Sequence, residues 1–290
     1  MRIPQPERVM VRQLIRAALR EDLGIRGDVT SLATIPSGSR STARIVAREN
    51  GVLCGVDIAR KVFRQCDRGI RTTSRYRDGM KIRRAQTILE IRGKTRAILA
   101  AERTALNFIQ RLSGIATLTH HFMVNLKLKI RNSKLRILDT RKTTPLLRTL
   151  EKYAVRCGGG ANHRAGLHDM VLIKDNHLAA LKSRFRRPIR EAVSRSRKRW
   201  PGLKVEVECD TLAQVLEAVE AGADILLLDN MKSSQLRRAV QIVRGRAKTE
   251  ASGGVTLKTV STIARTGVDF ISVGALTHSA PSMDFSLELV

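Results

Sequence analysis

The chain has 290 residues, of which 42% are hydrophobic, enough to bury the core of one large α/β unit or of two domains. Fifty-four Lys and Arg against 26 Asp and Glu give a formal charge of +28. No run of about eighteen apolar residues occurs and residues 1–14 lack a hydrophobic signal region, which argues against a membrane span and against secretion. We therefore expect a soluble, cytoplasmic protein.

The excess of basic residues is spread along the whole chain and forms no separate tail. A positive field speeds the capture of polyanionic substrates, and it also attracts nucleic acid without specificity. Aromatic residues make up only 3% of the chain, which argues against a base-stacking surface. We interpret the charge as compositional drift on solvated faces and expect no specific nucleic acid partner.

The first hundred residues predict an α+β unit. Residues 9–19 have the apolar spacing of a short helix, and three β-like runs follow at residues 42–48, 70–76 and 81–91. Asn50-Gly51 and Asp78-Gly79 are turn signals between these runs. Residues 97–112 again carry apolar side chains at helical spacing, so a long helix is expected to join the two halves of the chain.

From residue 135 onward, short apolar runs alternate with amphipathic helical patterns. The expected strands are residues 135–139, 170–174, 204–209, 225–229, 248–252 and 269–273, and helix faces are recognisable within residues 189–200 and 212–219. Such alternation predicts parallel strands joined by helical crossovers. A charged or polar residue stands near the carboxyl end of nearly every strand, which is the edge where a β/α barrel builds its site.

Basic side chains gather in the segment from residue 138 to residue 177, around the triple glycine at residues 158–160. They are Arg141, Lys142, His163, Arg164 and Lys174. Guanidinium groups bind carboxylates and phosphates in bidentate geometry, and lysine adds a mobile charge, so the segment predicts a cationic cup for a ligand with several negative groups. The spacing of His163, His168 and His177 fits no standard pattern of metal ligands.

Several sequence segments, from Glu21 to the C-terminus, occur in one order: EDLGIRGDVTS, AERTALNFIQRLSGIATLT, DTRKTTP, GGGANHR, VEVECDTL, LLLDN, EASGGV and VGALTHSAPSMDFSLEL. Any one of them alone would be weak, because short motifs recur by chance. Together they make the chain resemble the quinolinate phosphoribosyltransferase (decarboxylating) family, also called nicotinate-nucleotide pyrophosphorylase (carboxylating). Members of this family make nicotinate mononucleotide for NAD biosynthesis.

The resemblance implies an α/β plus α+β architecture. An N-terminal open-faced α/β sandwich is expected over residues 1–113, followed by an incomplete TIM-like β/α barrel over residues 114–275. Residues 276–290 are expected to pack back on the sandwich. The resemblance also implies a homodimer, or a higher oligomer, whose active sites are shared between subunits.

The substrates that the resemblance implies are quinolinate, a dicarboxylate, and phosphoribosyl pyrophosphate. The residues expected to bind their anionic groups are Arg103, Thr140, Arg141, Lys142, His163, Arg164 and Lys174. Arg103 is expected to reach into the neighbouring subunit's site. Without the resemblance, the sequence favours the alternative that this arginine is a helix-surface residue that pairs with Glu102 or a neighbour.

Two carboxylates, Glu208 in VEVEC and Asp229 in LLLDN, are expected near the ribose hydroxyls and a Mg²⁺ ion, held directly or through water. The alternative for both is a salt bridge to Lys174 or to an arginine, and the two interpretations are compatible. The expected seat of the 5′-phosphate comprises the residues after the last two strands, namely Ser252, Gly253, Gly254, Val273, Gly274 and Ala275.

The implied catalytic residues are Lys142, Lys174, Glu208 and Asp229. Lys142 or Lys174 is the expected source of the proton that replaces the lost carboxyl group. The chain departs from the usual family glycines at Leu146, at Lys182 and at Arg84-Ala85.

Two alternatives remain open at this stage. One is a paralogous phosphoribosyltransferase that acts on another anionic aromatic acid, and the cup favours a dicarboxylate over such an acid. The other is a basic polyanion-binding or RNA-binding protein that keeps the barrel as a scaffold. The carboxylates of Glu208 and Asp229 argue against this second alternative, because they would repel a polyanion.

Overall fold

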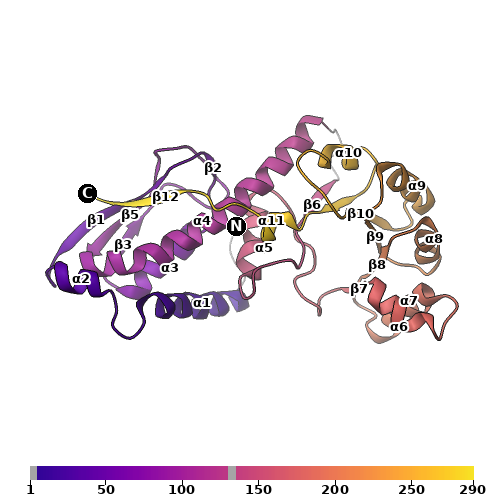
Figure 1. Ribbon diagram of the computed structural model, residues 1–290, viewed down its shortest axis with the longest axis horizontal. Helices are drawn as coiled ribbons and strands as arrows, with labels where there is room; N and C mark the ends of the chain where they lie inside the picture. The colour runs from indigo at the N-terminus through magenta and orange to yellow at the C-terminus, as the bar shows by residue number, and fades with distance from the viewer. Residues whose placement is uncertain (1–4, 130–134) are drawn as a thin grey trace. The chain divides into compact units, whose positions relative to one another are not determined.

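The computed structural model describes residues 5–129 and 135–290, which form two compact units. Unit 1 comprises the chain up to His120, together with Thr143–Gly159 and Leu276–Val290, and unit 2 comprises His121–Lys142 and Gly160–Ala275. The chain passes from one unit to the other within the long helix α4, Thr95–Lys129 (Figure 1). The boundary expected between residues 113 and 114 also falls inside this helix.

Unit 1 contains a four-stranded antiparallel sheet in the order β12-β1-β5-β3. Its strands are β1 Arg40–Ala47, β3 Arg71–Thr73, β5 Thr87–Lys94 and β12 Phe285–Leu289. Along β1, Ala43, Ile45 and Ala47 are fully buried whereas Arg44 is exposed, which is the alternation of a sheet with one covered face. The single run expected at residues 81–91 is two strands, β4, Lys81–Ile82, and β5. Strand β4 pairs with β2, Gly51–Val52.

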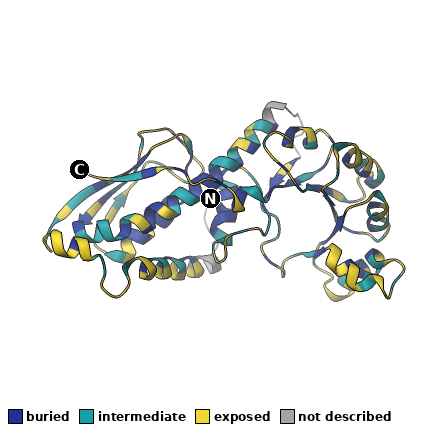
Figure 2. Cartoon of the chain, in the orientation of Figure 1, coloured by how far each residue is buried: buried dark blue, intermediate teal, exposed yellow. Residues whose placement is uncertain are grey.

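The remaining elements of unit 1 are helices α1 Gln5–Leu23, α2 Val29–Thr34, α3 Val56–Cys66 and α5 Arg148–Cys157. Helix α3 buries Ile58, Val62 and Phe63 on one face (Figure 2). The carboxylate of Asp78 accepts hydrogen bonds from the backbone N–H groups of Gly55 and Val56 at the start of this helix. The expected helices at residues 9–19 and 97–112 are confirmed, and both are longer than expected.

A fully buried carboxylate, Glu151, fixes the loop that contains the sequence RKTTP. Arg111 Nη2 on α4 lies 2.8 Å from Glu151 Oε1, and the backbone N–H and hydroxyl of Thr144 donate to the same carboxylate. Charge-assisted hydrogen bonds of this kind are stronger than neutral ones. Thr144 is therefore fixed to the core of unit 1.

Helix α4 makes a close backbone approach to the C-terminal segment at Gly114. A Cβ atom at this position would lie 1.9 Å from the carbonyl oxygen of Pro281 and 3.1 Å from Cα of Ser282. We expect Gly114→Ala to lower the free energy of unfolding by roughly 2–3 kcal/mol, because backbone atoms give way less easily than side chains. Urea unfolding of the purified variant measures this loss.

Gly202→Ala is the matched control, because no atom would lie within 4 Å of the added Cβ. Its free energy of unfolding should stay within about 0.5 kcal/mol of the unsubstituted protein. Equal stability of the Gly114 and Gly202 variants would contradict the proposed steric conflict.

Unit 2 contains a six-stranded sheet in the order β6-β11-β10-β9-β8-β7. The strands are β6 Arg136–Leu138, β7 Val171–Ile173, β8 Val205–Cys209, β9 Ile225–Asp229, β10 Lys248–Ser252 and β11 Phe270–Ser272. All five neighbouring pairs are parallel. Among the described strands, β6 and β7 follow each other in the chain without pairing, so the barrel is incomplete, as expected.

Helices alternate with the strands of unit 2 along the chain. They are α6 Asp175–Lys182, α7 Pro188–Arg199, α8 Leu212–Glu220, α9 Ser233–Val243 and α10 Val260–Ala264. Helix α11, Ala275–His278, follows the last strand, and all of it except Ala275 belongs to unit 1. All six strands expected from the sequence are confirmed to within one or two residues at each end. Across the described ranges, each helix is too short or too polar to cross a membrane.

Candidate active site

Five of the six parallel strands bring an expected site residue to one edge of the unit 2 sheet, because the carboxyl ends of parallel strands meet at the same edge. Asp229 ends β9 and Ser252 ends β10, and the two residues are directly paired in register. Lys174 follows β7, Glu208 lies one residue before the end of β8, and Val273 follows β11.

An ion pair joins two of the expected catalytic residues. Lys174 Nζ lies 2.5 Å from Glu208 Oε2, and the Glu208 side chain is only 10% exposed whereas that of Lys174 is 45% exposed. The pairing that the sequence offered as an alternative role for Glu208 is therefore present. Because the ammonium group stays accessible, Lys174 is able to exchange this carboxylate for an anionic ligand.

The start of helix α6 fixes the backbone of Lys174. His177 Nδ1 accepts a hydrogen bond of 2.9 Å from the Lys174 backbone N–H. This contact gives His177 the helix-capping role that its position after Lys174-Asp175-Asn176 suggests. His177 thus supports the site through the backbone.

The loop after β6 is organised by Asp139, which is fully buried. Its carboxylate accepts hydrogen bonds from the side chain of Asn162 and, at 2.9 Å, from the backbone N–H of His163. A bridge between Leu138 and Ala161 holds the same two segments together. The residues from Ala161 to His163 are thereby held beside the strand that precedes Arg141 and Lys142.

Two guanidinium groups lie close enough to repel each other. The pKa of Arg164 is lowered, first by burial and next by the charge of Arg141, and the charge of Glu206 opposes this change. Arg164 Nη1 also donates to the carbonyl oxygen of Met170 at 3.2 Å. Neighbouring cations of this kind favour a bound anion, since an anion relieves their repulsion.

Two turns lie at this edge of the sheet, one from Thr140 to Lys142 and one from Ser252 to Gly254. Thr140 Oγ1 accepts a hydrogen bond of 3.0 Å from the backbone N–H of Lys142. Gly253 and Gly254 have φ angles of 94° and 59°, and a Cβ at Gly253 would collide with the Asn230 side chain. Glycine is therefore required at position 253, the second of the residues expected to bind the 5′-phosphate.

Arg103 lies on α4 in unit 1, and its side chain is exposed. Burial raises the pKa of Glu102, and the charge of Arg103 opposes this rise. This electrostatic effect is consistent with the helix-surface role that the sequence left open. The reach of Arg103 into a neighbouring subunit's site stays a prediction.

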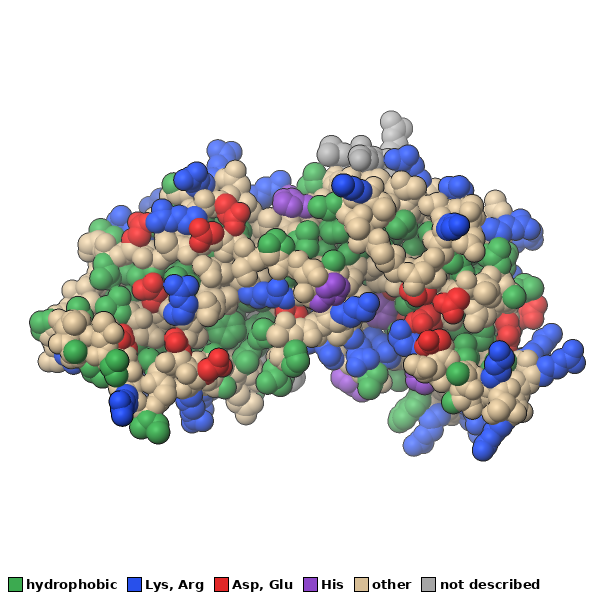
Figure 3. All heavy atoms as spheres, viewed as in Figure 1, with side chains coloured by type: hydrophobic (Ala, Val, Ile, Leu, Met, Phe, Trp, Pro, Cys, Tyr) green, Lys and Arg blue, Asp and Glu red, His purple; other side chains and the backbone are tan. Residues whose placement is uncertain are grey.

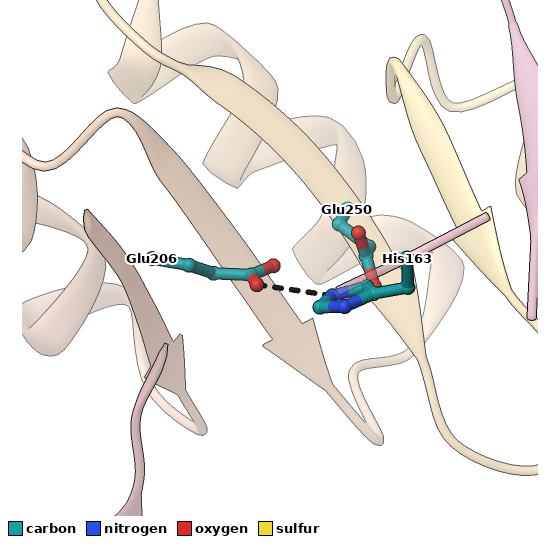
Figure 4. A group of neighbouring side chains, drawn as sticks. All are labelled: His163, Glu206 and Glu250. Atoms are coloured by element: carbon teal, nitrogen blue, oxygen red, sulfur yellow. Dashed lines mark ion pairs between the residues drawn. The ribbon is translucent and has the colours of Figure 1, made fainter. Parts of the chain in front are cut away.

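Sequence reasoning missed Glu206 and Glu250, two fully buried carboxylates within the sheet. His163 lies between them, with Nε2 at 3.0 Å from Glu206 Oε2 and 3.5 Å from Glu250 Oε1 (Figure 4). One signal was available, because Glu206 stands two residues before Glu208 and strand side chains of that spacing share a face. The expected contact of His163 with a substrate anion stays a prediction, since Nδ1 accepts from the Arg164 backbone N–H and Nε2 faces the carboxylates.

The protein has an incomplete parallel β/α barrel with basic side chains and carboxylates at the carboxyl edge of its strands. This arrangement is typical of enzymes that bind anionic substrates. Comparison with known proteins identifies the family. Residues 28–113 match the N-terminal domain of quinolinate phosphoribosyl transferase, and residues 115–288 match its C-terminal domain. The chain belongs to the quinolinate phosphoribosyltransferase family and is a phosphoribosyltransferase.

Similar proteins span almost the whole chain. Nicotinate-nucleotide pyrophosphorylase (carboxylating) of Mycobacterium leprae is 43% identical over 283 residues, covering 96% of each protein. The probable enzyme of that name from Bacillus subtilis is 40% identical over 282 residues, covering 97% of this chain and 94% of the relative. The structure of nicotinate-nucleotide pyrophosphorylase from Francisella tularensis has a TM-score of 0.90 at 41% identity, covering 100% of this chain and 99% of the other.

Proposed function

We propose that this enzyme transfers the phosphoribosyl group of phosphoribosyl pyrophosphate to quinolinate and decarboxylates the product. Nicotinate mononucleotide, pyrophosphate and CO₂ leave the site, which places the reaction in de novo NAD biosynthesis. The observation that carries the proposal is the strand edge that combines accessible Lys174 with Glu208 and Asp229, beside Arg141 and Arg164. The names of the M. leprae and B. subtilis relatives support the same reaction.

The basic residues divide between two anionic substrates. Arg141, Arg164 and Lys174 are proposed to bind the two carboxylates of quinolinate, with Arg103 supplied by a second subunit. Lys142 and the backbone of Ser252–Gly254 are proposed to bind phosphate groups of phosphoribosyl pyrophosphate. Lysine and backbone N–H groups suit phosphate, whereas the arginine fork suits paired carboxylate oxygens.

The carboxylates of this edge fit a Mg²⁺ ion. Glu208 and Asp229 offer hard oxygen ligands, and each has one oxygen committed to a protein donor, Lys174 Nζ and Asn230 Nδ2 respectively. This leaves few direct ligand positions, which suits an ion that keeps several waters and binds substrate phosphates. When bound, magnesium supplies neutralising charge to the pyrophosphate oxygens.

The first stage of the reaction develops positive charge on the ribose ring as pyrophosphate leaves C1. Glu208 and Asp229 stabilise this charge from the strand edge, while Lys142 neutralises the departing anion. The pyridine nitrogen of quinolinate attacks C1 and becomes cationic. Holding both substrates in one geometry supplies a large share of the acceleration.

The second stage loses the C2 carboxylate as CO₂. The carbon–carbon bond breaks with its electron pair left on C2, where the adjacent cationic nitrogen stabilises it. The chain's own residues hold the carboxylate and exclude water until the bond breaks. Lys142 or Lys174 then donates a proton to C2.

The proposal predicts strong discrimination between quinolinate and nicotinate, which lacks the second carboxylate. We expect kcat/KM for quinolinate to exceed that for nicotinate by roughly 10³-fold or more, because nicotinate leaves basic groups of the cup unpaired. A coupled assay that detects nicotinate mononucleotide measures both constants. Comparable constants for the two acids would instead favour a paralogous phosphoribosyltransferase.

A further inference from the structure

His163, Glu206 and Glu250 form a buried cluster inside the barrel of unit 2. The Glu206 and Glu250 residues are at most 1% exposed, and the His163 side chain is 8% exposed. Glu206 precedes Glu208 by two residues and Glu250 precedes Ser252 by two, so the carboxylates lie about 7 Å deeper than the site edge. The cluster therefore occupies the layer directly below the proposed substrate groups.

The spacing of the three side chains resembles a metal site, because one donor atom from each lies within 4.8 Å of the others. The imidazole argues against a metal. His163 Nδ1 accepts a hydrogen bond of 2.7 Å from the Arg164 backbone N–H, so the neutral ring carries its proton on Nε2. A protonated Nε2 has no lone pair for a metal ion, although Nε2 is the atom that faces both carboxylates.

The cluster has too few donors for two charged carboxylates. Within the described residues, neither oxygen of Glu206 nor Oε1 of Glu250 accepts a well-directed hydrogen bond, although His163 Nε2 lies nearby. Two buried carboxylates at this separation repel each other, and ionising both is costly in the absence of a cation between them. One of the two must therefore hold a proton.

We propose that Glu250 keeps its proton at neutral pH, so that the cluster never holds two negative charges, and that the cluster in this state positions His163 and Arg164 for quinolinate. The inference rests on the function proposed above.

The groups that face Glu250 favour this assignment. The pKa of Glu250 is raised to about 8, first by burial and next by the charge of Glu206, with a smaller effect of Asp139 in the same direction. The positive end of the His163 Nε2–H dipole, which lies 3.5 Å from Glu250 Oε1, and the hydroxyl of Ser272 on the neighbouring strand β11 oppose the change. On the other neighbouring strand, β9, the residue opposite Glu250 is the apolar Leu227.

The charge of the cluster acts on the cup through Arg164. Glu206 supports the charged form of this guanidinium, which burial and Arg141 disfavour. A second negative charge, appearing on Glu250 as the pH rises through 8, would lie beside His163 and would weaken the binding of anionic quinolinate by repulsion. Glu250 thus keeps the cup available for a dicarboxylate as long as it remains neutral.

The first test reads the proton directly. Infrared titration of the purified protein should show the C=O stretch of a carboxylic acid at pH 7, lost with a midpoint near 8. Glu250→Gln should abolish this band, and Glu206→Gln should lower its midpoint because the neighbouring charge is gone. The matched control is Glu102→Gln, which removes another carboxyl with a raised pKa and should leave the band in place.

The second test links the proton to substrate binding. The KM for quinolinate should rise roughly tenfold between pH 7 and pH 9 in the unsubstituted enzyme, and this rise should be absent from Glu250→Gln. Circular dichroism confirms that the variants are folded. A similar alkaline rise in both proteins would overturn the link to binding.

The outcomes separate this inference from the proposed reaction. If the enzyme does not use quinolinate, the infrared titration still reports where the proton lies. A band that survives in Glu250→Gln, or its absence from the unsubstituted protein, would overturn the assignment to Glu250. Elemental analysis that finds one transition metal ion per chain, lost in Glu250→Gln, would also overturn it.

Discussion

Replacing Glu208 with Gln is expected to lower kcat by roughly 10²–10³-fold while the Kd for quinolinate changes by less than about threefold. Glutamine keeps the shape of the side chain and removes the negative charge that stabilises the ribosyl cation. Quinolinate affinity is spared because Lys174, which Glu208 binds at 2.5 Å, is released for the ligand. Steady-state kinetics and calorimetry measure the two quantities separately.

Asp229→Asn should likewise lower kcat and leave the Kd for quinolinate nearly unchanged, since Asp229 ends the neighbouring strand β9 at the same edge. Lys174→Ala is the contrasting variant, in which quinolinate affinity should fall. A Glu208 variant that loses quinolinate affinity but keeps its turnover would contradict the proposed role of this carboxylate at the ribose and would place it in the quinolinate site instead.

The fold could be predicted from the sequence because its signals are local. The six strands of the barrel are apolar runs between amphipathic helices, and each was found at its place. Strands that are stabilised by pairing with distant parts of the chain could not be predicted from local patterns. In strand β12, Phe285–Leu289, only Phe285 is buried and the other four residues are half-buried or exposed. The pairing of β12 with β1 joins residues more than 230 positions apart.

The candidate site was predicted unevenly for a similar reason. Lys174 and Glu208 stand at strand ends, where position alone indicates a site, and the structure pairs them. The hydrogen bonds of Asp139 to the segment around Asn162 depend on a loop conformation that no periodicity encodes. Glu206 and Glu250 lie in the middle of buried strands, and only the curvature of the sheet brings them together around His163.

The departures from usual family glycines have a conformational consequence at two of the three places. Leu146 and Ala85 adopt left-handed backbone angles, with φ of 66° and 67°. Side chains with a Cβ are strained there by about 1–2 kcal/mol, which explains why glycine is common at such positions. Lys182 ends helix α6 and is outside the left-handed region, so its substitution carries no such strain.

Mixing two inactive variants, Arg103→Ala and Lys142→Ala, is expected to restore activity if subunits share sites in a homodimer. Arg103 is an exposed residue of α4, and the proposal assigns it to the partner subunit's barrel. In a heterodimer, one site then combines an intact Lys142 with an intact Arg103, and the other site lacks both. Each single-variant homodimer contains no intact site.

Statistical mixing makes half of the dimers heterodimers, each with one intact site of two. Recovery should therefore approach about a quarter of the activity of the unsubstituted enzyme in a closed two-fold dimer. A mixture of Lys142→Ala and Lys174→Ala is the matched control, because both residues follow strands of one barrel and no exchange of subunits assembles an intact site. If verified subunit exchange restores nothing in the first mixture, Arg103 serves its own chain's site or only the fold.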